Sequence, residues 1–334
     1  MKKIYWAFTL VLLLILGCTT AAQKKFHAIT LSGFTQGTYY KVTYYASDTV
    51  VTFAEIEAFF ADFLQTASLW EKNSIVARIN KNEPVTLNKE FIDIFTKAQE
   101  IAELSDGAFD ITVGNLVNAW GFGVKTGISP SPELIDSLRH FVGYQNIEIK
   151  DNIIIKKYPE ISINLNAIAK GYSVDLVSQW LQSKGITDFI VDIGGEVRAS
   201  GYKPDGSLWH VGIEKPSTDD MAARERQEII SITDKSMATS GTYRKYIEKD
   251  GIRYSHTIDP RTGYPINHTL LSATVIANDC VTADALATAF MVNGVDWAMA
   301  FLKENPQYEG YFVSSNCDDS FQVTYTEGIK KMMR

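Results

Sequence analysis

The chain has 334 residues, of which 46% are hydrophobic and 21% are charged, and its formal net charge is −7. This composition is typical of a folded globular protein and excludes a disordered or collagen-like chain. The acidic balance argues against a nucleic-acid partner, because proteins that bind nucleic acid concentrate positive charge.

The N-terminus predicts export. A basic start precedes an apolar run from Ala7 to Leu16 that is too short to span a bilayer. The small residue Gly17 and then Cys18 follow, so we expect removal of residues 1–17, lipidation of Cys18 and a lipidated linker over residues 18–32. The alternative is an ordinary cleaved signal with an unrelated cysteine. The expected product is a membrane lipoprotein that faces the periplasm, with a net charge of −9 because two lysines leave with the signal.

Residues 33–334 are predicted to form the folded domain, which is long enough for one large or two interlocked subdomains. Two further cysteines, Cys280 and Cys317, lie outside any CxxC motif. They are compatible with a disulfide in an oxidising compartment or with two buried thiols.

Hydrophobic periodicity predicts helices and strands that are interleaved along the chain. Helices are expected over Phe53–Leu69, Phe91–Leu104, Ile168–Lys184 and from Thr282 towards Met291. Strands are expected over Tyr39–Tyr45, Ile147–Ile149, Ile153–Ile155, Phe189–Ile193, Trp209–Ile213, Glu228–Ile232 and Ala273–Ala277, with a hairpin around Asp250-Gly251. Frequent hairpin signals favour an α+β fold with mixed or antiparallel sheets flanked by helices.

The most informative segments are Ser240–Arg244 and Ser255–Gly263. The second brings the imidazole of His256 close to a turn that carries Asp259 and Arg261. Proton-transfer and anion-binding groups thus occur within a few residues, which is typical of an active site.

Asp284 and Thr288 are four residues apart on the last predicted helix and therefore share one face. Their oxygens suit Mg²⁺, which takes few protein carboxylates. The alternative is that Asp284 only complements the helix dipole.

Three further motifs each allow a binding role and a plain structural one. Lys170 begins a helix after a polar turn, which suits a phosphate or a simple helix cap. Gly194 and Gly195 follow Asp192, which suits a ligand or a bulge. Asp110 and Thr112 precede a helix and are equally well explained as caps. A nucleophile elbow, a P-loop, a GxGxxG and an HExxH motif are all absent from the sequence.

Taken in order, these segments resemble the ApbE-type FAD:protein FMN transferase family. The resemblance covers residues 33 to 315 and rests on the following segments: Thr35–Tyr40, Asn73-Ser74, Arg78–Asn80, Phe109–Gly114, Trp120–Gly123, Ala167–Asp175, Val191–Glu196, Ser240–Tyr243, Ser255–Pro265 and Asp284–Thr288.

The resemblance implies that FAD binds in a cleft between the two subdomains and that its FMN half passes to a Thr or Ser hydroxyl of an acceptor protein, with AMP released. It implies Mg²⁺ held by Asp284, Thr288 and the backbone carbonyl of Ala167. Lys170, together with Arg244 or Arg261, would neutralise phosphate charge. It implies His256 as general base with Asp259 as its orienting partner. The remaining residues implied to bind FAD are Tyr40, Phe109, Asp110, Thr112, Asp192, Gly194, Gly195 and Thr242.

Two other functions fit nearly the same residues. One is a Mg²⁺-dependent FAD pyrophosphatase, and the other is a lipid-anchored FAD carrier without catalysis. For the transferase, the resemblance suggests that the acceptors are exported subunits of redox-driven ion pumps.

Overall fold

The computed structural model describes residues 26–123, 130–216, 226–242, 246–249, 252–316 and 320–334. The predicted signal, Cys18, Arg244, the Asp250-Gly251 turn and Cys317 lie outside the described residues.

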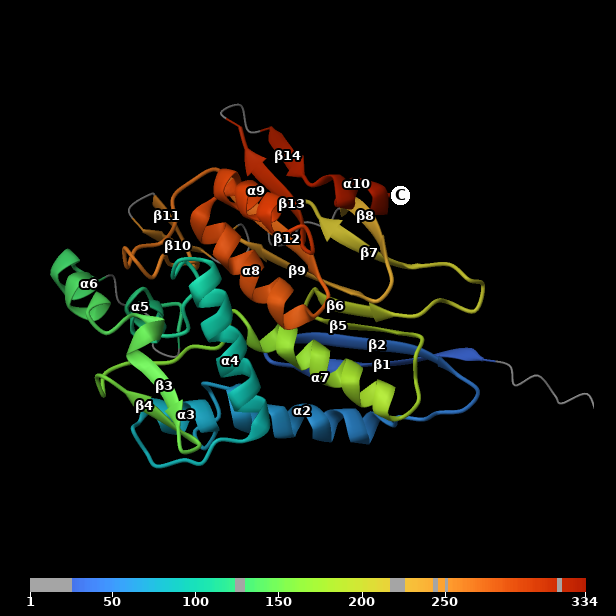
Figure 1. Cartoon of the computed structure of the whole chain (residues 1–334), viewed down its shortest axis with the longest axis horizontal. Helices are drawn as coiled ribbons and strands as arrows, with labels where there is room; N and C mark the ends of the chain where they lie inside the picture. Colours follow the sequence, from blue (N-terminus) through green and yellow to red (C-terminus); the bar gives the residue numbers. More distant parts are fainter. Residues whose placement is uncertain (1–25, 124–129, 217–225, 243–245, 250–251, 317–319) are drawn as a thin grey trace, which may run out of the picture.

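An antiparallel sheet of eight strands forms the centre of the described fold (Figure 1). Its order is β1-β2-β5-β6-β9-β12-β13-β14, and every neighbouring pair is antiparallel. The strands are β1 (His27–Thr35), β2 (Thr38–Ala46), β5 (Phe189–Ile193), β6 (Glu196–Ser200), β9 (Lys235–Gly241), β12 (Leu270–Ala277), β13 (Glu309–Ser315) and β14 (Phe321–Tyr325).

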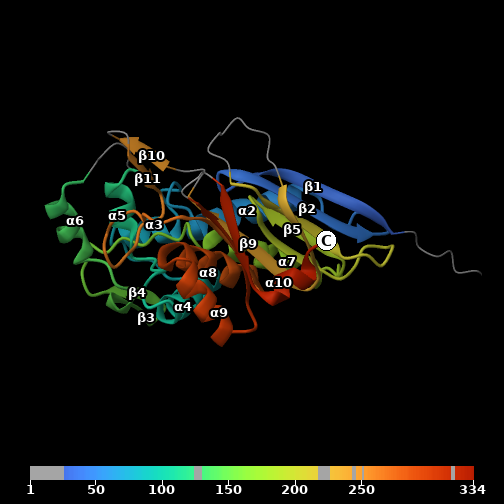
Figure 2. The ribbon, with the colours of Figure 1, turned by 90° about the horizontal axis from the view of Figure 1, so that it is seen from above.

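Helices cover one face of this sheet, as the two views in Figures 1 and 2 show. The helices packed there are α2 (Phe53–Ala67), α4 (Lys89–Leu104), α7 (Ala169–Ser183), α8 (Cys280–Asn293) and α9 (Val295–Glu304). Polar caps explain where they begin, since Thr52, Asn88 and Asp279 each accept a backbone amide in the first turn of α2, α4 and α8.

The opposite face of the sheet is partly covered by the hairpin of β7 (Trp209–Glu214) and β8 (Arg226–Ile232). Trp209, Val211 and Ile230 of this hairpin pack with Val197 of β6 and Ile276 of β12. The other described elements are α3 (Ile75–Asn80), α5 (Gly114–Ala119), α6 (Pro132–Arg139), the 3₁₀ turn Tyr144–Asn146, β3 (Ile147–Lys150), β4 (Ile153–Lys156), β10 (Tyr246–Lys249), β11 (Ile252–Ser255) and α10 (Glu327–Met332).

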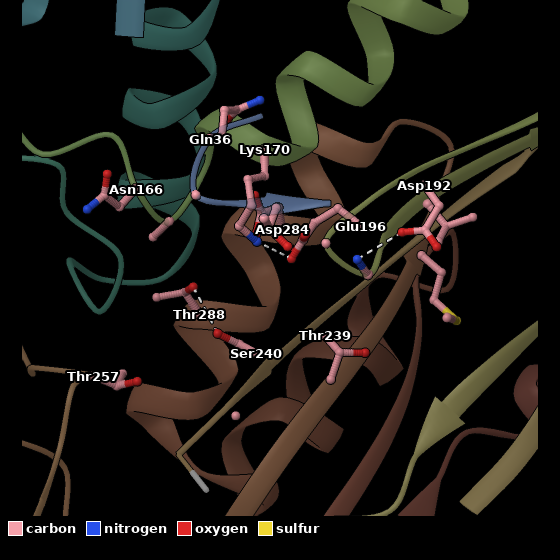
Figure 3. A pocket seen from close by; sticks show the side chains of 18 of the residues that line it. Gln36, Asn166, Lys170, Asp192, Glu196, Thr239, Ser240, Thr257, Asp284 and Thr288 are labelled. Carbon is pink, nitrogen blue, oxygen red and sulfur yellow. Dashed lines mark hydrogen bonds and ion pairs between the residues drawn. The ribbon is translucent and has the colours of Figure 1, made fainter. Parts of the chain in front are cut away.

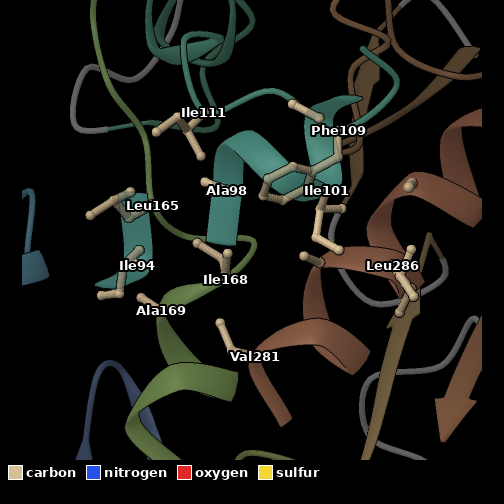
Figure 4. Close-up of a cluster of buried hydrophobic side chains, with 14 of the residues drawn as sticks. Ile94, Ala98, Ile101, Phe109, Ile111, Leu165, Ile168, Ala169, Val281 and Leu286 are labelled. Atoms are coloured by element: carbon tan, nitrogen blue, oxygen red, sulfur yellow. The ribbon is translucent and has the colours of Figure 1, made fainter. Parts of the chain in front are cut away.

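The largest hydrophobic cluster joins the sheet to the helical half of the molecule (Figure 4). Ile94, Ala98 and Ile101 of α4 are buried together with Ile168 and with Leu286 of α8. Because one hydrophobic cluster includes residues of the helices and of the sheet, the two share a core, and their relative position is fixed by close packing.

The structure confirms the strands and helices predicted from periodicity to within a few residues, and it confirms the α+β class. The predicted linker 18–32 is wrong at its end, because residues 27–32 belong to strand β1. Its alternation of small and apolar residues, with Ile29 and Leu31 packed against the core, is a strand pattern that pairs with β2. The Cys280 thiol is buried and free of any disulfide.

Candidate functional site

A cavity of about 820 Å³ lies beside the sheet face that carries the β7–β8 hairpin and reaches Asp284 and Thr288 of α8. Pockets of about 300–1,000 Å³ are typical of sites for small molecules and cofactors. Strand side chains form one wall, and α8 together with the turn before α7 forms another (Figure 3). The principal lining residues are Tyr39, Lys41, Phe109, Asp110, Asn166, Ala167, Lys170, Asp192, Gly194, Gly195, Glu196, Trp209, His210, Thr239, Ser240, His256, Asp284 and Thr288.

The α8 wall presents hard oxygen atoms. Asp284 and Thr288 line the cavity one helical turn apart, and the Thr288 hydroxyl shares a hydrogen bond of 3.3 Å with the hydroxyl of Ser240. Oδ2 of Asp284 accepts a hydrogen bond from the backbone amide of Gly171 at 2.9 Å. Burial raises the pKa of Asp284, while the Lys170 charge and this hydrogen bond oppose the rise.

Lys170, near the start of α7, forms an ion pair with Glu196 at the start of β6. Burial lowers the pKa of Lys170, but the charges of Glu196 and Asp284 outweigh it, so the net pKa lies above the usual value. Burial raises the pKa of Glu196 to about 7; the Lys170 charge opposes this rise and the Asp284 charge adds to it. The wall therefore combines two carboxylates with one ammonium group (Figure 3).

The Gly194-Gly195 turn joins β5 to β6 and lines the cavity with backbone. Both residues have positive φ, 65° and 103°, which favours glycine. A Cβ on Gly194 would lie 2.6 Å from Thr38, whereas one on Gly195 would meet nothing within 4 Å. Oδ1 of Asp192 accepts the Gly195 amide at 2.9 Å, and its Oδ2 accepts the Tyr39 hydroxyl at 3.3 Å. Asp192 thus holds the turn in place.

Phe109 and Asp110 line the cavity, but the described hydrogen bonds of Asp110 hold the local chain together. Its Oδ1 accepts both the amide and the hydroxyl of Thr112 at 2.7 Å, and its Oδ2 accepts the Tyr144 amide at 2.7 Å. Thr112 is fully buried and accepts the Gly143 amide at 2.8 Å. Burial raises the pKa of Asp110, and these three hydrogen bonds counteract the rise.

His256 lines the cavity, and its ring centroid lies 6.3 Å from that of Phe122. Asp259 does not line the cavity. Its carboxylate accepts the amide and Nε of Arg261 at 2.9 Å each and Nη2 at 3.0 Å. In this structure Asp259 therefore orients Arg261, which also lies outside the lining.

The structure brings together most of the predicted site residues but leaves five outside the cavity lining: Tyr40, Thr112, Thr242, Asp259 and Arg261. Tyr40 is 0% exposed and donates its hydroxyl to Glu57 at 2.5 Å, on the helical side of the sheet. Alternation along β2 instead directs Tyr39 and Lys41 into the cavity. Thr242 directly follows β9, and its amide and its hydroxyl both donate to the carbonyl of Leu271.

The sequence-based predictions missed Tyr39, Glu196 and Ser240 as lining residues. Tyr39 belongs to the segment Thr35–Tyr40 and Glu196 to the segment Val191–Glu196. The sequence of such a segment does not tell which face of the sheet each side chain occupies. Ser240 could have been found, because it begins the segment Ser240–Arg244 that the sequence already marks as a candidate active-site segment.

The α8 wall suits a hard divalent cation. A carboxylate at Asp284, a hydroxyl at Thr288 and the chain at Ala167 all border the same cavity. Within the described ranges, no cluster of three or more His, Cys, Asp or Glu side chains forms a metal site on its own. A cation here would therefore rely on few protein ligands and on oxygens of a ligand, as Mg²⁺ commonly does.

Comparisons with known proteins place this geometry in a known group. Residues 36–312 match the ApbE family. The chain is 40% identical over 303 residues to a protein of Vibrio cholerae named FAD:protein FMN transferase, with 88% of this chain and 89% of that protein covered. A protein of the same name from Haemophilus influenzae is 35% identical over 327 residues, with 93% of each covered.

Solved structures of flavin transferases named ApbE are also similar to this chain. The flavin transferase ApbE from Vibrio cholerae superposes with a TM-score of 0.81 at 36% identity and covers 92% of this chain and 100% of that chain. The apo flavinyl transferase ApbE from Pseudomonas stutzeri gives a TM-score of 0.80 at 34% identity, with 92% and 96% covered.

Proposed function

The chain belongs to the ApbE family and is an enzyme, and we propose that it transfers the FMN half of FAD to a Thr or Ser hydroxyl of an acceptor protein. In this reaction the hydroxyl oxygen bonds to the FMN phosphorus, the bond from that phosphorus to the AMP oxygen breaks, and AMP leaves. The observation that carries the proposal is the 820 Å³ cavity whose wall joins Asp284, Thr288 and Lys170.

We propose that Asp284, Thr288 and the backbone carbonyl of Ala167 hold Mg²⁺. When bound, the cation would neutralise diphosphate charge and stabilise the charge that develops on the leaving AMP. Lys170 lies on the same wall, and its ion pair with Glu196 keeps it protonated and fixed in position. A chain with an acidic net charge needs this local concentration of positive charge to hold a diphosphate.

The flavin and adenine rings of FAD would lie along the remaining lining. Phe109 offers an aromatic face, and the Gly194-Gly195 backbone allows close approach because neither residue carries a Cβ. Asp110, Asp192 and Thr112 support this surface by fixing the two loops that carry it.

The acceptor hydroxyl needs a base, since a neutral alcohol is a weak nucleophile. His256 lines the cavity and is the group that we propose removes the hydroxyl proton. Asp259 and Arg261 contribute as a pair that shapes the turn after His256 rather than as direct partners of the substrate.

One experiment separates transfer from the two other functions that fit these residues. The purified protein is incubated with FAD, Mg²⁺ and a peptide that carries a flavinylation-type Thr, and AMP release and peptide mass are followed. Equal amounts of AMP and FMN-labelled peptide support the transferase. AMP without labelled peptide would identify a pyrophosphatase, and bound FAD with neither product would identify a carrier.

We also propose that the protein is exported, is lipidated at Cys18 and acts at the periplasmic face of a membrane. The basic and apolar N-terminal run that ends at Cys18 supports this proposal. Among the helices in the described part of the chain, none is long and apolar enough to cross a membrane. The acceptor would then be an exposed segment of an exported protein, and an exported subunit of a redox-driven ion pump fits this requirement.

A further inference from the structure

Two ion pairs with buried carboxylates and partly exposed cations join α7 to β6, with opposite polarity. Lys170 of α7 pairs with Glu196 of β6, and Asp175 of α7 pairs with Arg198 of β6 at 2.5 Å. Glu196 and Arg198 are two residues apart on one strand and so lie on the same face of the sheet. The two pairs therefore join the same two elements, which makes a direct comparison of their carboxylates possible.

Both oxygens of the Asp175 carboxylate accept hydrogen bonds from other residues of the chain. Its Oδ1 accepts hydrogen bonds from Arg198 and from the Cys280 amide at 3.0 Å, and its Oδ2 accepts the Val281 amide at 2.8 Å. These bonds secure the start of α8. Asp175 and Arg198 do not line the cavity, so this pair has a structural role.

In the Glu196 carboxylate, only one of the two oxygens has a partner among the described residues. Its Oε1 contacts the Lys170 ammonium, whereas its Oε2 has no hydrogen-bond partner among the described residues. Glu196 is only 2% exposed, so bulk water reaches this oxygen poorly. An unsatisfied buried acceptor is unfavourable, and native proteins rarely keep one without a reason.

Glu196 also lines the cavity, next to the Gly194-Gly195 turn and on the wall that carries Lys170 (Figure 3). An ionised carboxylate oxygen can only accept hydrogen bonds, so its partner in a ligand must be a donor. Phosphate oxygens of a diphosphate are acceptors and do not qualify. In FAD, the ribityl chain on one side of the diphosphate and the ribose on the other side both carry hydroxyls, which can donate.

We propose that Glu196 is a substrate-binding residue whose Oε1 positions Lys170 for the diphosphate and whose Oε2 accepts a hydrogen bond from a sugar hydroxyl of bound FAD. This inference rests on the proposed function. The hydroxyl belongs either to the ribityl chain on the FMN side or to the ribose on the AMP side.

The test measures equilibrium binding of FAD, FMN, AMP and inorganic pyrophosphate by calorimetry at pH 8, in EDTA and without acceptor. Glu196→Gln should weaken FAD binding about ten-fold or more, because a charged acceptor binds a hydroxyl more strongly than a neutral one. The same loss should appear with FMN if the hydroxyl is in the ribityl chain, or with AMP if it is in the ribose. Pyrophosphate, which has no sugar hydroxyl, should lose less affinity than FAD.

Asp175→Asn is the matched control, since it disturbs the other α7–β6 pair away from the cavity. It should lower the melting temperature and leave FAD affinity unchanged. Glu196→Asp keeps the negative charge but shortens the side chain by one methylene, so it should also weaken FAD binding. This variant replaces Glu196→Gln if the Gln variant does not fold.

Wild-type FAD affinity in both Glu196 variants would overturn the inference while leaving the proposed function intact. An equal loss for pyrophosphate and FAD would also overturn it, because Glu196 would then act only through Lys170. A wild-type protein that fails to bind FAD would overturn the proposed function and this inference together.

Discussion

The backbone amide of Gly171 donates a hydrogen bond of 2.9 Å to Oδ2 of Asp284, which locks the start of α7 against the first turns of α8. The contact depends on the missing side chain of Gly171. A Cβ there would lie 2.4 Å from the Cys280 carbonyl oxygen and 2.7 Å from the Asp284 Cβ. Close packing of two helices thus sets the position of the carboxylate that we assign to the cation.

Gly171→Ala should therefore destabilise the protein by about 1–3 kcal/mol, because the backbone atoms that it meets cannot move away cheaply. It should also weaken Mg²⁺ binding through displacement of Asp284. Urea denaturation and metal titration measure the two effects. Gln182→Ala, at an exposed position of the same helix, serves as control and should change neither. Wild-type stability in Gly171→Ala would show that the two helices are not in tight contact.

The stability of the protein should depend on pH through Glu196. Burial raises the pKa of Glu196 from 4.5 to about 7 in the folded protein. Between these values the folded state holds a proton that the unfolded state has lost, so the unfolding free energy falls as pH rises from 4.5 to 7. Glu196→Gln lacks this contribution. The stability difference, wild type minus variant, should therefore decrease by up to roughly 3 kcal/mol across the window. Parallel profiles from urea melts would contradict the shift.

Asp284→Ala separates a metal ligand from a group that only complements the helix dipole. Loss of a favourable dipole contact costs about 0.3–1 kcal/mol and leaves turnover intact. Loss of a Mg²⁺ ligand should abolish AMP release while the fold survives. Thermal melting and AMP production over a Mg²⁺ titration decide between them. Normal turnover at saturating Mg²⁺ would remove Asp284 from the metal site.

His256→Asn should slow FMN transfer by roughly 10²–10⁴ if the imidazole is the general base. The wild-type rate should rise with pH as the imidazole loses its proton, and this acid limb should flatten in the variant, while FAD affinity changes little. Single-turnover transfer measured against pH, with FAD binding in parallel, tests this. A variant that keeps the wild-type acid limb would exclude His256 as the base.

Cys18→Ser should abolish lipid labelling of the protein and its retention in the membrane fraction, because each buried CH₂ of an acyl chain contributes about 0.8 kcal/mol to anchoring. Metabolic labelling with a fatty-acid analogue measures this directly. A serine variant labelled as strongly as wild type would disprove the lipoprotein proposal.

Local patterns in the sequence were enough to locate most elements around the site. Helical spacing predicted α4 and α7, and β-branched and aromatic runs predicted β2 and β5. These signals are local, since each comes from one segment burying one of its own faces. Strand β1 was missed because its pattern is weak and becomes meaningful only when β2 pairs with it.

The motif residues Asp284, Thr288, Lys170 and His256 could also be identified from the sequence, and the fold brings all four to one cavity. Their partners could not be identified in the same way. Glu196 pairs with Lys170 from 26 positions away, and Asp284 is held by Gly171 across two helices.

The element types, the chemistry of the motif residues and the family resemblance can be predicted before any fold is known, because they depend on residue identity and spacing. Three features become visible only in the folded chain: Tyr39 rather than Tyr40 faces the cavity, Asp259 holds Arg261, and Glu196 keeps one oxygen unpaired within the described residues. The reason is that side-chain direction and hydrogen-bond satisfaction depend on which distant segments pack together, and this is settled only when the sheet and helices assemble.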